Sequence, residues 1–447
     1  MTFESSGPVA VGIDAAIVAD HQVTLRRPEP GRPGVIVERF KVGSTVAGLS
    51  QLTERLSAFP GSVVVCEPTS MTWLSIQIAA ERAGCEMSLI GTRHSARLRG
   101  ALVGKHKSDV IDADMLSRAG EFFALDPTRP PTPQELALRR VVQLRHRQVV
   151  AQNRTHRRIV SLASWAFPDV WRPLASSRAA SLGVLRRWPN LAGLSRARTA
   201  TIAEVIAANT RGVSDVHRRA ERVRDGARAW VEFWDGRLDL DALEWELFEL
   251  LDDYDTARQR IGRATAEMTR RWEQRWGDDP VLMSVPGMGV ITAPIVRAFF
   301  GDGRHLDDAK AAQSYVGMNP SNWSSGTVAQ PSRSITKEGP EELRLAFYQA
   351  ANAARMVDPQ LAEFYRRLMV ERGHCHAKAT CAVARKLIGR TWAIITSGTP
   401  YEMRGLAGEP ITRRQARQLV TDLAVPDRIR ARTRSHSTAT RRGRLAS

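Results

Sequence analysis

Four carboxylates in the N-terminal part of the chain stand where side chains of an open sheet could meet. Asp14 ends one apolar run, VAVGID, and Glu67 follows another, SVVVC. Asp109 and Asp112 lie three residues apart in KHKSDVIDADML, so they would share one face of a helix. Because the ends of strands in such a sheet face a common crevice, we expect the four carboxylates to converge there.

Carboxylates that gather in one place repel each other and raise each other's pKa unless a cation neutralises them. Hard oxygen donors of this kind suit Mg²⁺ or Mn²⁺. Two such ions about 4 Å apart can activate the attacking oxygen and stabilise the leaving oxygen in phosphoryl transfer. The alternative is that the acids are turn, cap or solvated surface residues. Asp114 is five residues from Asp109, so it should point away from the others.

The segments around these acids predict one α/β domain over residues 1–125, because strands come first and then alternate with helices. The predicted strands are 9–19, 34–42, GSVVVCEP and CEMSLIG, and the predicted helices are 46–58, TWLSIQIAAERAG and much of 94–120. Lys105 and Lys107, on either side of His106, could contact phosphate, although a solvated basic surface explains them equally well.

The rest of the chain is predicted to be mainly helical. A proline-rich linker over 126–134 leads to a helical region over 135–277. Within it, apolar residues at helical spacing over 240–276 favour either a coiled-coil dimer contact or a helix packed within its own chain. A third unit covers 278–405, and 406–447 is a basic segment that we expect to be disordered.

The formal net charge of +18 and the pI of about 10.7 favour a polyanionic partner. Nearly all of the basic residues are arginine, which suits bidentate phosphate contacts, although codon bias also enriches arginine. The four cysteines do not form a disulfide framework. No signal peptide or membrane-length apolar run is evident, so a cytoplasmic protein is expected.

The order Asp14, Glu67, Asp109, Asp112 resembles the Asp-Glu-Asp-Asp signature of the IS-one-ten insertion-sequence transposases and the related Piv-type DNA invertases. The third unit is similar to the second conserved region of the same family. The matching stretches are VPGMGVITA (285–293), SYVGMNP (314–320), SSG (324–326), ITKEG (335–339) and LRLAFYQAA (343–351).

This resemblance implies a RuvC-like, RNase H-like fold for the first domain, with the four acids as metal ligands. It implies that the serine before glycine, Ser325, forms a covalent phosphoserine link to DNA; Ser324 is the alternative. It also implies a homo-oligomer, dimer or tetramer, that joins donor and target DNA under a structured guide RNA. The fold class is therefore α/β plus all-α, with a helical arm and a mainly α-helical C-terminal domain.

A recombinase must conserve bond energy without ATP, and a serine–phosphate bond does so where hydrolysis would not. Arg333, Lys337 and Arg344 could hold phosphates near this serine. Gly287 and Gly289 form a Gly-x-Gly turn before a helix, whose backbone N–H groups could bind phosphate. A zinc site at His374, Cys375, His376 and Cys381 is disfavoured because the spacing lacks a Cys-x-x-Cys pair.

The same residues leave three other functions open. A site-specific invertase would use the same chemistry at a fixed DNA site. A RuvC-type nuclease would hydrolyse DNA with metal-activated water and would form no protein–DNA bond. A non-catalytic nucleic-acid-binding protein would rely on the basic helices and the basic C-terminal segment.

Overall fold

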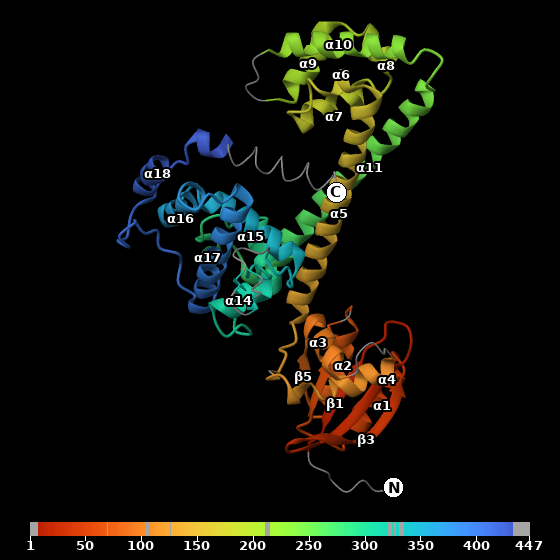
Figure 1. Ribbon diagram of the computed structural model, residues 1–447, viewed down its shortest axis with the longest axis vertical. Helices are drawn as coiled ribbons and strands as arrows, with labels where there is room; N and C mark the ends of the chain where they lie inside the picture. Colours follow the sequence, from red (N-terminus) through yellow and green to blue (C-terminus); the bar gives the residue numbers. More distant parts are fainter. Residues whose placement is uncertain are drawn as a thin grey trace. The chain divides into compact units, whose positions relative to one another are not determined.

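The computed structural model describes residues 8–68, 70–102, 108–125, 127–210, 215–320, 324–325, 328–329 and 335–431. The chain divides into two compact units, Met1–Thr132 and Pro133–Ser447. Unit 1 contains the five-stranded sheet, and unit 2 is almost entirely helical (Figure 1).

The sheet of unit 1 has the strand order β3-β2-β1-β4-β5. Its strands are β1 (Ala10–Asp14), β2 (His21–Glu29), β3 (Arg32–Val42), β4 (Val63–Cys66) and β5 (Glu86–Leu89). The first three strands are antiparallel, whereas β4 lies parallel to β1 and β5 lies parallel to β4. This mixed order is that of an RNase H-like domain, so the predicted α/β fold of the N-terminal part is confirmed.

Helices cover both faces of the sheet. They are α1 (Val46–Leu56), α2 (Thr72–Arg82), α3 (Thr92–Leu102) and α4 (Asp109–Leu116), followed by the short 3-10 helix η1 (Ala119–Glu121). Successive residues of a strand face opposite sides. Accordingly, Val64 belongs to the core that α1 and α2 complete, and Val65 to a smaller core beneath α3 and α4.

Strand β2 was not predicted, and the predicted strand 9–19 is too long, since β1 ends at Asp14. The sequence of β2, HQVTLRRPE, contains two arginines and a proline, which hides the buried half of the strand. Arg26 is nevertheless buried, because its guanidinium donates to Ser117 Oγ and to the carbonyl of Gly34. The shorter β1 places Asp14 at the carboxyl end of the strand.

Gly12 allows α4 to lie directly on β1. A Cβ atom at this position would come within 2.0 Å of the carbonyl oxygen of Ala113 and 2.2 Å of the amide nitrogen of Ser117. Both contacts are with backbone, so no side chain could move aside to make room. The glycine in the middle of VAVGID is therefore required by the approach of the helix that carries Asp109 and Asp112.

We expect Gly12→Ala to destabilise unit 1, because the extra methyl group must push α4 away from the sheet. Overpacking of this kind costs about 1–3 kcal/mol, and more where backbone has to shift. Thermal unfolding followed by circular dichroism measures the loss. Gly100→Ala is the matched control, since Gly100 is an exposed residue of α3 with open space around it. An equal fall in melting temperature for both variants would contradict the packing argument.

Unit 2 is built on two long helices, α5 (Pro133–Ala166) and α11 (Leu240–Trp276). They run antiparallel: the start of α5 shares a core with the end of α11, through Leu138 and Met268, and the end of α5 shares another core with the start of α11. The apolar stripe of α11 therefore packs against α5 of the same chain, as the second of the two interpretations predicted.

Residues 171–235 are rich in arginine and tryptophan and have a less regular apolar spacing than the long helices, yet they are mainly helical in the structure. With α6 (Pro168–Trp171) they form a small helical body that contains α7 (Arg178–Arg187), α8 (Leu191–Arg196), α9 (Thr199–Ala208) and α10 (Val216–Phe233). Side-chain caps at Ser177 and Asn190 start α7 and α8. Helices as short as α6 to α9 carry too few turns for a clear apolar period.

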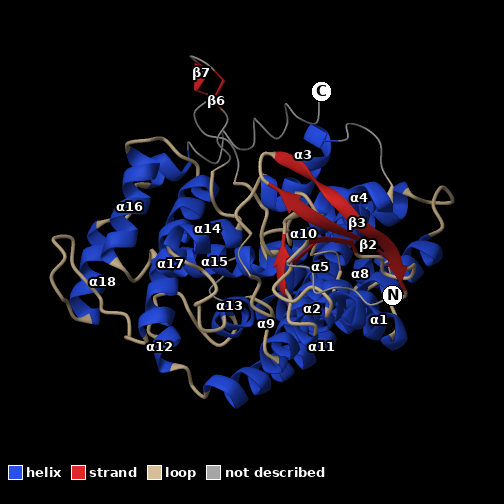
Figure 2. Ribbon diagram, turned by 90° about the horizontal axis from the view of Figure 1, so that it is seen from below, coloured by secondary structure: helices blue, strands red, loops and turns tan. Residues whose placement is uncertain are grey.

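The remaining helices of unit 2 pack around a core that includes Phe300, Phe347 and Leu387. They are α12 (Pro280–Met283), α13 (Thr292–Phe300), α14 (Ala309–Val316), α15 (Glu341–Ala354), α16 (Pro359–Val370), α17 (His376–Ser397) and α18 (Arg413–Asp422) (Figure 2). In chain order, the two-residue strands β6 (Ser324–Ser325) and β7 (Val328–Ala329) follow α14 and precede α15. Among the described residues, no helix combines the length and apolar character needed to cross a membrane.

The expectation of disorder over 406–447 is wrong for its first part, because residues 413–422 form α18. Thr412 and Gln415 make a capping box at the start of this helix, and Ala416 is buried. A capping box stabilises a helix start even when the segment has few apolar residues. Residues 432–447 lie outside the described residues.

Candidate active site

Asp14 and Glu67 lie next to each other at the carboxyl ends of two neighbouring parallel strands. In the pairing of β1 with β4, Ile13 is opposite Cys66, so the residues that follow them stand at the same level. Neighbouring strands are about 4.8 Å apart. Burial, together with the charges of Asp14 and Glu67, raises the pKa of the Cys66 thiol to about 12. Both carboxylates are half-buried, and the charges of both act on the same thiol.

The other two predicted acids lie on α4, which packs on β1. Ser108 caps this helix by accepting a hydrogen bond from the amide of Ile111, and Asp109 occupies the exposed first turn. Asp112 is buried, and its carboxylate accepts a hydrogen bond of 2.8 Å from Arg99 Nε on α3. Arg99 was not singled out from the sequence, since nothing in its spacing distinguishes it from the other arginines.

The four acids thus come from adjacent elements but do not all meet in the structure. In the described ranges, no three His, Cys, Asp or Glu side chains form a group that could hold a metal ion. The structure brings Asp14 and Glu67 together at the sheet edge. It places Asp109 and Asp112 on the helix that covers β1, with Asp112 paired to an arginine.

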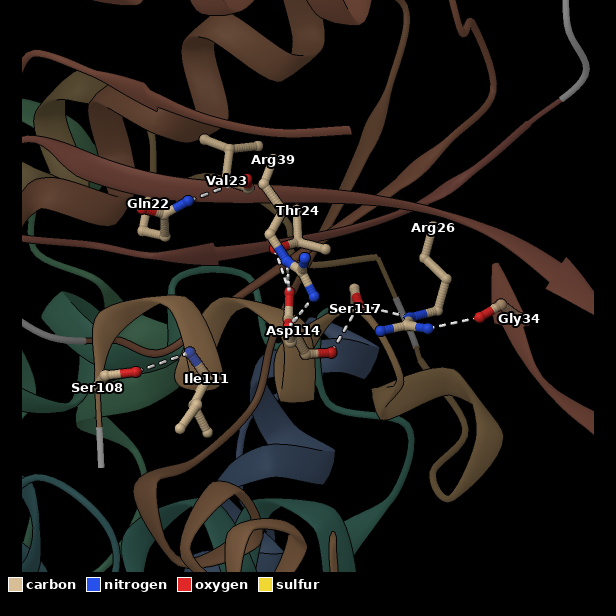
Figure 3. A network of polar contacts seen from close by, with 10 residues as sticks. All are labelled: Gln22, Val23, Thr24, Arg26, Gly34, Arg39, Ser108, Ile111, Asp114 and Ser117. Carbon is tan, nitrogen blue, oxygen red and sulfur yellow. Dashed lines mark hydrogen bonds and ion pairs between the residues drawn. The ribbon is translucent and has the colours of Figure 1, made fainter. Parts of the chain in front are cut away.

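Asp114 anchors α4 to the antiparallel side of the sheet. Its carboxylate accepts hydrogen bonds from Thr24 Oγ1 at 2.8 Å and from the Arg39 guanidinium at 2.8 and 2.7 Å (Figure 3). Ser117, one turn further on, accepts from Arg26 and donates to the carbonyl of Asp114. Asp114 therefore fixes the helix rather than joining the other acids, as its spacing from Asp109 predicted.

Burial would raise the pKa of Asp114, but the hydrogen bonds from Arg39 and Thr24 outweigh it and hold the pKa below its usual value. A carboxyl whose pKa is lowered by folding stabilises the protein above its unfolded pKa of about 3.9, and that stabilisation is lost as the pH falls through the folded pKa.

We expect Asp114→Asn to lower the free energy of unfolding at pH 7 by about 1–2 kcal/mol, because charge-assisted hydrogen bonds to a partly exposed carboxylate disappear. The deficit should shrink as the pH is lowered below 4, where the wild-type carboxyl also becomes protonated. Urea unfolding over this pH range measures both. Arg39→Gln should produce the same deficit, and the double variant should add little to it. A deficit that does not change with pH would show that the charge of Asp114 is not involved.

The predicted nucleophile lies in a short hairpin of unit 2. Ser325 pairs with Val328 and Ser324 with Ala329, in the antiparallel pair β6–β7 (Figure 2). Residues 326 and 327, which join the two strands, lie outside the described residues. The backbone therefore places Ser325 as the last paired residue before the connection.

The segment 321–334, which carries this hairpin, is flanked by the motifs SYVGMNP (314–320) and ITKEG (335–339), which we call its base. Pro320 and Ile335 form an antiparallel bridge, and the amide of Thr336 donates to the carbonyl of Asn319 at 2.9 Å. A Cβ atom on Gly339 would come within 1.9 Å of the carbonyl oxygen of Tyr315, so this glycine permits the two motifs to touch. The two motifs therefore pack against each other on either side of the segment 321–334.

The cations predicted near the serine differ in their surroundings. Lys337 is exposed and lies in the left-handed region, with a φ of 58°. Arg344 is half-buried, and its guanidinium donates to the carbonyl of Gly339 at 2.9 Å, so it also holds the base of the hairpin segment. Arg333, Lys105 and Lys107 lie outside the described residues.

Packing accounts for the first glycine of the Gly-x-Gly turn. Gly287 has a φ of 83°, and a Cβ atom there would come within 2.1 Å of the carbonyl oxygen of Ala350 on α15. Gly289 faces open space, but its amide already donates to Thr292 Oγ1 at 2.8 Å. One of the two amides expected to bind phosphate is therefore engaged within the protein.

The zinc site that the sequence disfavoured gains no support in the structure. His376 Nδ1 is hydrogen bonded to the hydroxyl of Tyr365 at 2.8 Å, and Cys381 is a half-buried residue of α17. These side chains belong to the packing of the C-terminal helices.

The sheet order, with acids at the ends of β1 and β4 and on α4, the second helix after β5, defines a RuvC-like domain joined to a mainly helical unit. Two family models match this chain. A model of DEDD transposases of the IS110 type, described as a transposase, matches residues 11–168, and a model described as the transposase IS116/IS110/IS902 family matches residues 279–366. Together the two matches cover more than half of the chain.

Similar proteins point to the same family. An uncharacterized 43.6 kDa protein of insertion element IS110 from Streptomyces coelicolor is 26% identical over 366 residues, which cover 80% of this chain and 88% of that protein. The pilin gene-inverting protein of Moraxella lacunata is 30% identical over 125 residues, covering 28% of this chain and 38% of that protein. A solved structure of T. thermophilus RuvC in complex with a Holliday junction substrate matches 27% of this chain and 99% of that chain, with 14% identity and a TM-score of 0.21.

The chain belongs to the IS110 family of insertion-sequence transposases. It is an enzyme that cuts and rejoins DNA. The predicted family and enzyme class are thereby confirmed.

Proposed function

We propose that this transposase breaks and rejoins DNA through a divalent metal site at the sheet edge of unit 1 and a phosphoserine formed on Ser325 of unit 2. The observation that carries the first half is the adjacency of Asp14 and Glu67 at the ends of β1 and β4. The second half is supported by the match of residues 279–366 to the family and by the hairpin position of Ser325.

The residues present fit a hard divalent cation. Asp14, Glu67 and Asp109 offer only carboxylate oxygens, which Mg²⁺ and Mn²⁺ prefer. Two negative charges side by side at a sheet edge are costly unless a cation neutralises them. We propose that Asp14, Glu67, Asp109 and Asp112 hold the ions. When bound, such ions would polarise the scissile phosphate and lower the barrier to attack on it.

Arg99 would hold Asp112 in place as a ligand. A buried carboxylate without a partner would be strongly destabilising, and Arg99 supplies the positive charge that Asp112 needs. The salt bridge also fixes the direction of the Asp112 side chain. The chain can thus keep one ligand of the site in place before a cation arrives.

The serine supplies the covalent step. Its Oγ loses a proton and forms a bond to phosphorus. At the same time the bond from phosphorus to one DNA ester oxygen breaks, and that oxygen takes up a proton and leaves as a hydroxyl. The phosphodiester energy is kept in the serine–phosphate bond, so a hydroxyl of another strand can later displace the serine and rejoin the DNA. The acids and the serine thereby serve the same phosphoryl transfer.

The proposal also assigns a role to each region of the chain. We infer a catalytic domain over 1–125, a linker over 126–134, a nucleic-acid-binding and oligomerisation region over 135–277 and the serine domain over 278–405. Donor and target DNA would be joined by a homo-oligomer under a structured guide RNA. Lys105, Lys107, Gly287, Gly289, Arg333, Lys337 and Arg344 are the proposed nucleic-acid contacts. The similarity to a pilin gene-inverting protein keeps a site-specific invertase as the second candidate, with the same chemistry.

The experiment that tests the phosphoserine is trapping of a protein–DNA bond on a labelled substrate bearing an element end. The wild-type protein should form a covalent adduct that survives denaturation, and Ser325→Ala should form none, because the attacking hydroxyl is gone. Ser324→Ala is the matched control, since it removes the same hydroxyl from the neighbouring residue of β6. An adduct that persists in Ser325→Ala and disappears in Ser324→Ala would move the nucleophile by one residue. Strand cleavage without any adduct would instead favour a hydrolysing nuclease.

A further inference from the structure

A pocket of about 520 Å³ in unit 2 is lined by residues of α18 and the segment after it, of α16 and of the turn between α15 and α16. Figure 2 shows α16 and α18 near each other. It is separate from the serine hairpin and its base. Its wall is largely apolar and includes Met356, Val357, Leu423 and Val425. Met356 is 54% exposed and Val357 is 40% exposed, although both are large apolar residues. A pocket lined by exposed apolar side chains is typical of a ligand-binding or partner-binding site.

Three arginines border the same pocket. Arg355 comes from the end of α15, Arg417 from α18, and Arg430 from the segment after it. Arg355 lies over the ring of Tyr365, with 4.3 Å between the guanidinium carbon and the ring centroid. This contact holds the guanidinium in place before any ligand binds.

Arg355 and Arg430 add positive charge to the same pocket. Burial lowers the pKa of Arg355; the charge of Arg430 lowers it further, whereas Tyr365 and Tyr348 act in the opposite direction. The same two charges add to burial in lowering the pKa of His376. Arg430 also meets Asp427 at 3.9 Å, but the Asp427 side chain is 99% exposed, which makes this a weak surface pair.

A ligand for such a pocket must combine a flat apolar body with a negative charge. A duplex presents phosphates but keeps its bases stacked, so it would leave the apolar wall empty. An unpaired nucleotide presents both groups, and bases of any sequence bind apolar and aromatic surfaces. The following segment of this chain, residues 432–447, contains five arginines and no acidic residue, so its charge makes it an unsuitable occupant.

We propose that this pocket binds one nucleotide of an unpaired nucleic-acid strand, with the base against Met356, Val357 and Leu423 and the phosphate at the arginines. The strand could belong to DNA opened during strand exchange or to an RNA, because the recognised chemistry is the same. The proposal does not depend on the metal site or on Ser325.

The test measures binding of a fluorescent oligo-dT, an oligo-rU and a DNA duplex to the full-length protein at one fixed salt concentration. Ala424→Trp should weaken binding of at least one unpaired strand by about tenfold, because the indole fills the pocket without changing the charge, while duplex binding stays the same. Arg417→Glu combined with Arg430→Glu should have a similar effect on the same strand.

The matched control for charge is Arg428→Glu, since Arg428 is exposed on the same segment and is not one of the lining side chains. It should weaken the binding of all three probes slightly and equally. A loss restricted to oligo-dT or to oligo-rU supports the proposal and identifies the source of the strand. Unchanged binding of both unpaired strands in Ala424→Trp, or an equal loss in Arg428→Glu and the pocket variants, would overturn it.

Discussion

The contact of α4 with β1 at Gly12 is the constraint on which the acidic site depends. Asp14 ends the strand and Asp109 and Asp112 lie on the helix, so their separation is fixed by how closely the two backbones approach. Gly12 permits that approach, and the hydrogen bonds of Asp114 with Thr24 and Arg39 hold the helix at the other side. Protein interiors are close-packed, so a shift of this helix by a few tenths of an ångström would be passed directly to the acids.

In the serine region of unit 2, glycines likewise permit close contact between backbone segments. Gly339 lets ITKEG lie against Tyr315, and Gly287 lets the turn before α13 lie against Ala350. Gly287 was predicted to contact phosphate, and Gly339 is the last residue of the family motif ITKEG. The structure gives a packing reason for both. A short β6–β7 hairpin can then project from a base whose two ends are fixed by backbone bonds and by Arg344.

Much of the fold followed from the sequence. Apolar runs that end in Asp14 and Glu67 predicted β1 and β4, and long apolar periods predicted α5 and α11. Strand β2 did not follow, because the burial of Arg26 depends on bonds to Gly34 on the next strand and to Ser117, 91 residues away, which no local pattern reveals. The pairing of Asp112 with Arg99 was hidden because the two residues lie on different helices, α4 and α3. Helix α18 was missed because its capping box, rather than an apolar stripe, stabilises it.

The central claim is that the sheet edge of unit 1 is a divalent cation site. The most direct measurement is titration of the full-length protein with Mn²⁺, with free Mn²⁺ followed by its electron paramagnetic resonance signal. Asp14→Asn should weaken Mn²⁺ binding by about tenfold or more, because it removes a ligand. Glu86→Gln should bind as the wild type does, since Glu86 is an exposed carboxylate at the amino end of β5, away from the carboxyl ends where Asp14 and Glu67 lie. Equal Mn²⁺ affinity in the wild type and in Asp14→Asn would contradict the claim.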